Sequence, residues 1–208
     1  HSIHLKPLAE DALSLPVRTG KARVIGIEPA SLVTKSLVRE VKTDDAGCFQ
    51  SALNPGLTKI AVIERHKRTG KLGIGILEGY GLTGGAIATT ISHDSHNIVV
   101  AGDNDPDMLL AVRELADMGG GIVSVHGGSI RRLPLPIAGL MTSADPQEVN
   151  AVLHDMLVAA RAELGIPEDV EPFMTLSFMA LPVIPELKLT ARGLFNVNTF
   201  SFVGVEAD

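Results

Sequence analysis

The sequence predicts an α+β or α/β domain in which a mixed β-sheet carries a few packed helices. Segments with the residue pattern of strands outnumber those with helical periodicity, and the two kinds partly alternate along the chain. The 21 glycines and 12 prolines favour short strands joined by turns over long helices. Apolar residues form 45% of the 208-residue chain and charged residues 20%, so the chain can bury a core of its own.

Most of the predicted strands lie in the first half of the chain. Residues 22–28 alternate apolar and polar side chains, and residues 57–64 are rich in β-branched side chains, so both segments are predicted strands. Residues 34–41 fit a short strand or a frayed helix, and the polar segment 44–56 is predicted to be a loop. Three more strands are expected over residues 73–77, 85–92 and 97–101.

Two amphipathic helices are expected in the second half. Asp105 and Asp145 are their predicted N-caps, because each is followed by a proline and then by apolar residues at helical spacing. Gly119 and Gly165 follow the last periodic residues, so the helices are expected to end there.

The remaining segments are predicted to be extended. Residues 122–125 and 129–133 flank a short glycine-containing turn and are expected to pair as a hairpin. Residues 172–194 are apolar but contain Pro182 and Pro185, and these prolines favour a wandering extended segment over a central strand.

Charge and cysteine content exclude several classes of function. A formal net charge of −6 argues against a broad basic face, so we expect no nucleic-acid partner. Cys48 is the single cysteine, which rules out an internal disulfide and a thiolate zinc cluster and suits a cytoplasmic setting. No apolar run has the length of a membrane span and no signal peptide is recognisable, so we expect no membrane partner.

The densest cluster of polar, potentially functional side chains lies in one five-residue segment. It lies between two apolar strands, so the chain must turn there and expose polar side chains at an end of the sheet. An Asx-type turn would explain the carboxylate, hydroxyl and amide without any function, but such a turn needs no histidines. We therefore favour a functional interpretation, as a substrate-pocket or lid element, for His93, Asp94, Ser95, His96 and Asn97.

A second, smaller cluster ends the strand predicted over residues 57–64. Glu64 and His66 could contribute to the same site, and a solvated strand end with a local ion pair explains them equally well. His93 and His96 would share a face only on a helix, so metal binding by this chain alone is not favoured. No residue is assigned a catalytic or metal-binding role, because no His-x-His pair occurs.

Six linked motifs lie at residues 60–66, 79–81, 85–97, 133–141, 172–178 and 181–190. Together they resemble the C-terminal region of bacterial adenine deaminases of the amidohydrolase superfamily. Their order and spacing are similar from about residue 23 to residue 202.

This resemblance implies a metal-dependent enzyme that converts adenine and water to hypoxanthine and ammonia. It implies three parts: a (β/α)₈ barrel with a pair of Mn or Fe ions, a small β domain, and this α+β domain at residues 22–208. Residues 1–21 are then a linker or a remnant of the preceding β domain. Because the family's metal ligands lie in the barrel, none is carried over, and this segment is expected to bind no cofactor and to be inactive alone. The absence of an initiator Met favours a piece of a longer polypeptide.

The resemblance also implies the partners of the domain. We expect the rest of its own polypeptide, a small purine substrate and further copies in a homo-oligomer. The turn at His93–Asn97, with Glu64 and His66, is hypothesised to close over the barrel's active site and hydrogen-bond the purine edge. Two alternatives remain open at this point: a structural or oligomerisation domain, and a small-ligand binding module.

Overall fold

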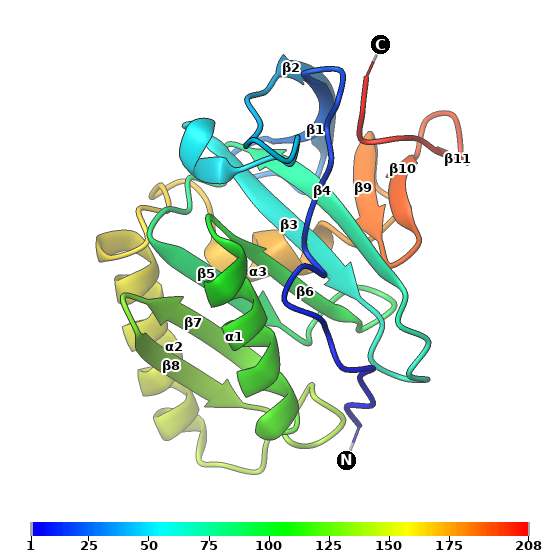
Figure 1. Ribbon diagram of the computed structural model, residues 1–208. Coiled ribbons are helices and arrows are strands. Elements are labelled where there is room, and N and C mark those ends of the chain that lie inside the picture. Colours follow the sequence, from blue (N-terminus) through cyan, green and yellow to red (C-terminus); the bar gives the residue numbers. More distant parts are fainter. Residues whose placement is uncertain (1, 208) are drawn as a thin grey trace.

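The computed structural model describes residues 2–207 and consists of two sheets and three α-helices (Figure 1). The main sheet has eight strands in the order β2-β1-β4-β3-β6-β5-β7-β8, and only β1 and β4 run parallel among its neighbours. The mixed sheet with a few packed helices that the sequence predicts is therefore confirmed. Its strands are β1 (Lys21–Ile27), β2 (Thr34–Glu40), β3 (Leu57–Ile63), β4 (Leu72–Glu78), β5 (Gly85–Thr89), β6 (Ile98–Gly102), β7 (Gly121–His126) and β8 (Ser129–Pro134).

The second sheet is small and packs against the main one. It has three strands in the order β11-β10-β9, and β9 and β10 contact β4. These strands are β9 (Leu187–Thr190), β10 (Gly193–Asn196) and β11 (Ser201–Phe202). The helices are α1 (Asp105–Asp117), α2 (Pro146–Ala162) and α3 (Pro172–Phe178), and a single 3-10 turn, η1, spans Ser51–Leu53.

An apolar cluster covers each face of the main sheet, and successive side chains of a strand contribute to the two clusters in turn. Ile60 and Val62 of β3 face an apolar cluster that includes side chains of α2, α3 and the small sheet. Ala61 and Ile63 face the opposite cluster, which includes α1. Figure 1 shows α1 lying across one face of the sheet while α3 lies behind it. This two-sided burial explains why the central strands are apolar almost throughout.

Several local predictions are decided or corrected by the structure. Residues 34–41, which fitted a strand or a helix, form strand β2, since Thr34–Glu40 pair antiparallel with all of β1. The strand expected over residues 85–92 ends at Thr89. Just beyond it, the Thr90 hydroxyl donates to the carbonyl of Gly139, in a loop outside the sheet. The loop predicted at 44–56 contains η1.

The predicted start of the first helix is wrong by one residue. Asn104 is the N-cap, because its backbone is extended and its side-chain oxygen accepts from the Asp107 amide at 2.9 Å. Asp145 is confirmed as the N-cap of α2, since its Oδ1 accepts from the Gln147 amide at 2.8 Å. Helix α2 ends at Ala162, three residues before Gly165.

The prediction of an extended segment over residues 172–194 is wrong for its first third. Pro172 begins helix α3, where a missing backbone N–H costs nothing, and Glu171 caps the helix by accepting from the Met174 amide. Phe173 and Leu176, three residues apart, are buried against the main sheet. The two prolines that suggested a wandering chain lie beyond the helix, in the connection to β9.

The N-terminal segment packs onto the domain rather than leaving it (Figure 1, dark blue). Leu13 is buried in the cluster on the α1 side, and Leu15 and Val17 are buried in a third cluster with Phe49. The amide of Val17 donates to Gly47 O at 3.0 Å, and the amide of Phe49 donates to Leu15 O at 2.8 Å. Across residues 2–207, none of the helices combines the length and the apolar character needed to span a membrane.

Candidate functional site

The polar segment His93–Asn97 forms a tight turn between β5 and β6, as the sequence predicts for a chain reversal. The His96 amide donates to Ser92 O at 2.6 Å, and His96 adopts a left-handed conformation with φ of 46°. At the other end of the turn, the His93 amide donates to Ser177 O in α3 at 3.2 Å. The turn is therefore closed by its own backbone bond and held against helix α3 at His93.

The His96 ring is held as a neutral imidazole. Its Nδ1 accepts from the Ser92 amide at 3.4 Å, which leaves Nε2 to carry the ring proton. Burial lowers the pKa of His96, and its neighbours His93, Arg65 and His66 lower it further, while Asp94 opposes them. At neutral pH the ring is therefore a hydrogen-bond donor through Nε2 and carries no charge.

His93 borders a small cavity on the other side of the turn. Its ring lies 4.4 Å from the ring of Phe178 at an interplanar angle of 40°, and 6.1 Å from the His96 ring. The cavity has a volume of about 260 Å³ and lies between α2, α3 and the sheet. Most of its wall is apolar, formed by Ile91, Ile122, Leu153, Phe173 and Met174.

Of the two residues predicted from the end of β3, one reaches the turn. His66 Nε2 lies 2.8 Å from the carbonyl oxygen of Ser95. Glu64 binds its own loop instead: its carboxylate accepts from the amides of His66, Lys67 and Thr69 and from the Thr69 hydroxyl, over 2.6–3.0 Å. Burial alone would raise the pKa of Glu64, but these hydrogen bonds outweigh it and lower the pKa to about 2.

We expect Glu64→Gln to destabilise the chain by about 1 kcal/mol at pH 7, because an amide accepts the loop's hydrogen bonds more weakly than a carboxylate. The pKa of Glu64 is lower in the folded chain than its ordinary value of 4.5, so its stabilisation is complete above pH 4.5. It is lost as the pH falls from 4.5 towards 2. Urea denaturation at pH 7 and pH 3 measures the difference, which should shrink at pH 3. A difference that grows on acidification would contradict this account.

The sequence reasoning missed Arg65, which lies between the two residues it selected. The Arg65 side chain is buried, with 1% exposure, and its Nε donates to the carbonyl oxygen of His96. In the sequence it follows Glu64 directly, a pattern typical of a solvated ion pair at a strand end. No local signal distinguishes the two cases, because the carbonyls that Arg65 binds are distant in sequence.

The residues present do not fit a pair of divalent metal ions. Among residues 2–207, no group of three or more His, Cys, Asp or Glu side chains is arranged to hold a metal ion. The carboxylate of Glu64, which the sequence placed beside the turn, is bound to its own loop. The turn itself offers hydrogen-bonding groups and the rings of His93 and His96.

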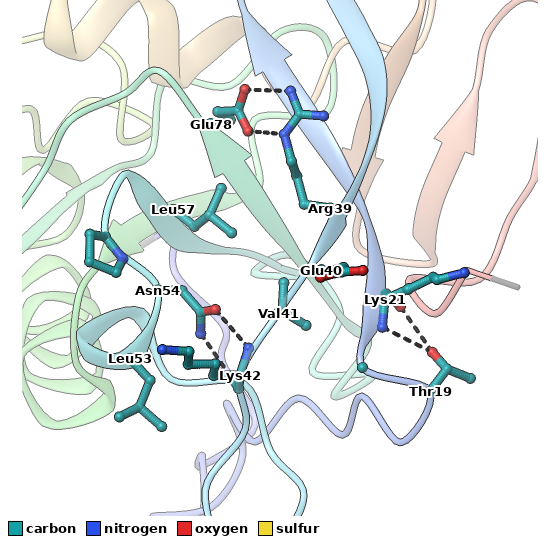
Figure 2. Close-up of a pocket in the computed structure, with 12 residues that line it drawn as sticks. Thr19, Lys21, Arg39, Glu40, Val41, Lys42, Leu53, Asn54, Leu57 and Glu78 are labelled. Atoms are coloured by element: carbon teal, nitrogen blue, oxygen red, sulfur yellow. Dashed lines mark hydrogen bonds and ion pairs between the residues drawn. The ribbon is translucent and has the colours of Figure 1, made fainter.

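A second and larger hollow lies away from the turn, beside β2 and η1 (Figure 2). It is open and has a volume of about 660 Å³. Some of its polar groups bind one another: Arg39 makes two bonds to Glu78 at 2.6 and 2.8 Å, and Asn54 bonds both the amide and the carbonyl of Lys42. These four groups are satisfied within the fold.

Comparison with known families identifies the chain. Residues 31–201 match the family described as the adenine deaminase C-terminal domain. The chain belongs to this family. The match includes β3, the turn at His93–Asn97 and Arg65, so the candidate site lies wholly inside the adenine deaminase C-terminal domain.

Individual relatives agree with the family match. The chain is 58% identical over 205 residues to a protein named adenine deaminase from Nitratidesulfovibrio vulgaris Hildenborough, covering 98% of this chain and 35% of that protein. It is 47% identical over 206 residues to adenine deaminase 2 of Carboxydothermus hydrogenoformans, covering 99% and 36%. An adenine deaminase of Clostridium acetobutylicum is 44% identical over 204 residues, covering 98% and 36%. The chain thus spans about a third of the length of these relatives.

Proposed function

We propose that this domain is the C-terminal part of a metal-dependent adenine deaminase, which hydrolyses adenine to hypoxanthine and ammonia. The family match and the printed names of relatives 44–58% identical to the chain support this proposal. In this proposal a pair of Mn or Fe ions belongs to the barrel of the full-length polypeptide. In the same proposal this domain supplies no metal ligand, in keeping with the lack of a three-residue His, Cys, Asp or Glu cluster among residues 2–207.

We propose further that the turn at His93–Asn97 contributes to the substrate pocket. The observation that carries this is the neutral His96 ring, whose Nε2–H complements an unprotonated ring nitrogen of a purine. The buried oxygens Ser92 Oγ and Asn97 Oδ1 stand at the two ends of the turn and have no hydrogen-bond partner within residues 2–207. Closure of such a turn over the mouth of a barrel would exclude water from the reacting base.

The other predicted residues have supporting roles in this proposal. His66 fixes the turn through the carbonyl of Ser95, and Glu64 orders the loop that carries His66. Asp94 and Ser95 are exposed at the tip of the turn and would meet the substrate or the barrel. Residues 1–21 connect the domain to the preceding part of the polypeptide, and the enzyme acts in purine metabolism in the cytoplasm as a homo-oligomer.

A purely structural or oligomerisation domain is the second candidate. Its support is a set of exposed apolar side chains on α2 and α3: Val158 is 52% exposed and Met174 is 57% exposed. Such side chains are typical of a surface that packs against another domain or subunit. Under this alternative the turn could be altered without any effect on substrate affinity.

Ammonia release from adenine tests the proposed function. We expect release by the full-length polypeptide with added Mn²⁺ and none by the 208-residue chain under the same conditions. Deamination by the chain alone would overturn the assignment of the metal pair to the barrel. Absence of deamination by the metal-loaded full-length polypeptide would refute the proposed activity.

A further inference from the structure

Arg65 is a buried cation that has no acidic partner in the part of the chain that the structure describes. The ion pairs within residues 2–207 are all made by basic side chains other than Arg65. Burying a guanidinium without a carboxylate is costly unless its N–H groups are all hydrogen-bonded. Arg65 binds only neutral oxygens, so its position serves a purpose other than neutralising a charge.

These oxygens belong to three segments that are far apart in sequence. Nε donates to the carbonyl of His96, one terminal nitrogen donates to the carbonyl and hydroxyl of Ser2 at 3.0 and 3.2 Å, and the other donates to the carbonyl of Ala138 at 3.0 Å. The turn, the N-terminal segment and the loop after β8 therefore meet at one side chain.

The loop after β8 is shaped to admit the guanidinium. Gly139 has a φ of 73°, and a Cβ at this position would lie 3.0–3.2 Å from the guanidinium atoms of Arg65. The loop is anchored independently, because the Thr90 hydroxyl donates to the carbonyl of Gly139 at 2.6 Å. A larger residue at position 139 would displace Arg65 from the turn.

We propose that Arg65 is the positioning residue of the turn at His93–Asn97. Its guanidinium binds the His96 carbonyl and keeps the backbone there left-handed. This orients the His96 ring to donate through Nε2. This inference rests on the proposed function of the turn. The left-handed conformation is unfavourable for a residue with a side chain, so it needs an external contact to hold it.

The charge of Arg65, like its hydrogen bonds, favours a neutral His96 ring that donates through Nε2. Four ionisable groups face the His96 ring: His93 and Asp94 on the turn itself, and Arg65 and His66 at the end of β3. After burial, which is the largest effect, His93 and Arg65 lower the pKa of His96, whereas Asp94 raises it. Removing the charge of Arg65 should therefore raise the pKa of His96, and keeping the charge at this position should not.

Two substitutions separate the charge from the geometry. Arg65→Gln removes the charge, Arg65→Lys keeps the charge but loses the three-way hydrogen bonding, and Arg113→Gln on the exposed face of α1 is the control. The titration midpoint of the His96 ring is measured by NMR in the 208-residue chain. We expect an upward shift in Arg65→Gln and no shift in Arg65→Lys or in the control. An unchanged midpoint in Arg65→Gln would overturn the electrostatic part of the inference.

Kinetics of the full-length polypeptide test the positioning part. Both Arg65 substitutions should raise KM for adenine about tenfold, and Arg65→Gln alone should move the acid limb of the pH profile upward. An unchanged KM in both variants, with wild-type activity, would overturn the positioning role.

The titration of His96 in the unsubstituted chain tests the inference even if the Arg65 variants do not fold. His96 should titrate below 6.5, the ordinary pKa of histidine, and a midpoint at or above 6.5 would contradict the inference. The NMR titrations contain no substrate, so they decide the link between Arg65 and His96 even if the polypeptide deaminates nothing. Failure of the proposed function would appear only in the kinetics.

Discussion

Replacement of His96 by Asn in the full-length polypeptide is expected to lower kcat/KM for adenine by about 10–100-fold. The shorter Asn side chain tolerates the left-handed backbone, so the turn is kept while the Nε2–H donor is lost. One missing hydrogen bond to a buried heterocycle costs about 1.4–2.8 kcal/mol, which corresponds to this range. Steady-state kinetics with adenine measure the change, and His154→Asn on the exposed face of α2 is the matched control.

The pH dependence of the reaction rate tests in which direction protonation of His96 acts. The pKa of His96 is lowered in the folded chain, so on acidification the unfolded chain binds a proton first and the native turn loses stability below pH 6.5. Protonation also places a hydrogen on Nδ1, which then opposes the Ser92 amide instead of accepting from it. The wild-type polypeptide should therefore show an acid limb below pH 6.5 that is weaker in His96→Asn.

Two results would count against this role. If His96→Asn and His154→Asn left KM and kcat equally unchanged, the turn would be structural only, and the second candidate function would be favoured. If His96→Asn lowered kcat/KM but the acid limb persisted at the same pH, the limb would belong to another group. Circular dichroism and urea denaturation of both variants show whether a loss arises from unfolding.

The main strands and helices could be predicted because their signals are local. The β-branched residues within 57–64 are enough to predict a strand, and the structure confirms it as Leu57–Ile63. Helix α3 escaped prediction since Pro182 and Pro185, which lie outside it, dominated the interpretation of the apolar run.

The candidate turn could be located from sequence, but the contacts that hold it could not. A cluster of two histidines between apolar strands marks a turn with polar chemistry. Arg65 binds Ser2 and Ala138, which lie 63 and 73 residues away, and no residue pattern near position 65 reports such distant partners. Glu64 is a different case: its partners lie only two to five residues away, and its carboxylate orders its own loop rather than facing the turn.

Replacement of Gly73 by Ala is expected to destabilise the chain by about 3 kcal/mol. Gly73 lies on β4 where the small sheet packs against it, and a Cβ there would lie 2.1 Å from the Thr190 carbonyl oxygen and 3.0 Å from the Gly193 amide nitrogen. Both obstacles are backbone atoms of the β9–β10 hairpin, so no rotamer change relieves the overlap. The small sheet must move away from β4, which exposes apolar side chains that it covers.

Gly75→Ala is the matched control, two residues along the same strand and on the same face. A Cβ at position 75 would lie 3.6 Å from side-chain carbons of Ile60 and Leu189, an ordinary van der Waals distance. Its effect should stay within about 1 kcal/mol, since the added methyl fits and the unfolded chain loses freedom. Urea denaturation of the 208-residue chain measures both variants. Equal destabilisation would show that β4 merely disfavours substitution, whereas a loss confined to Gly73→Ala shows that the glycine is required by the contact between the two sheets.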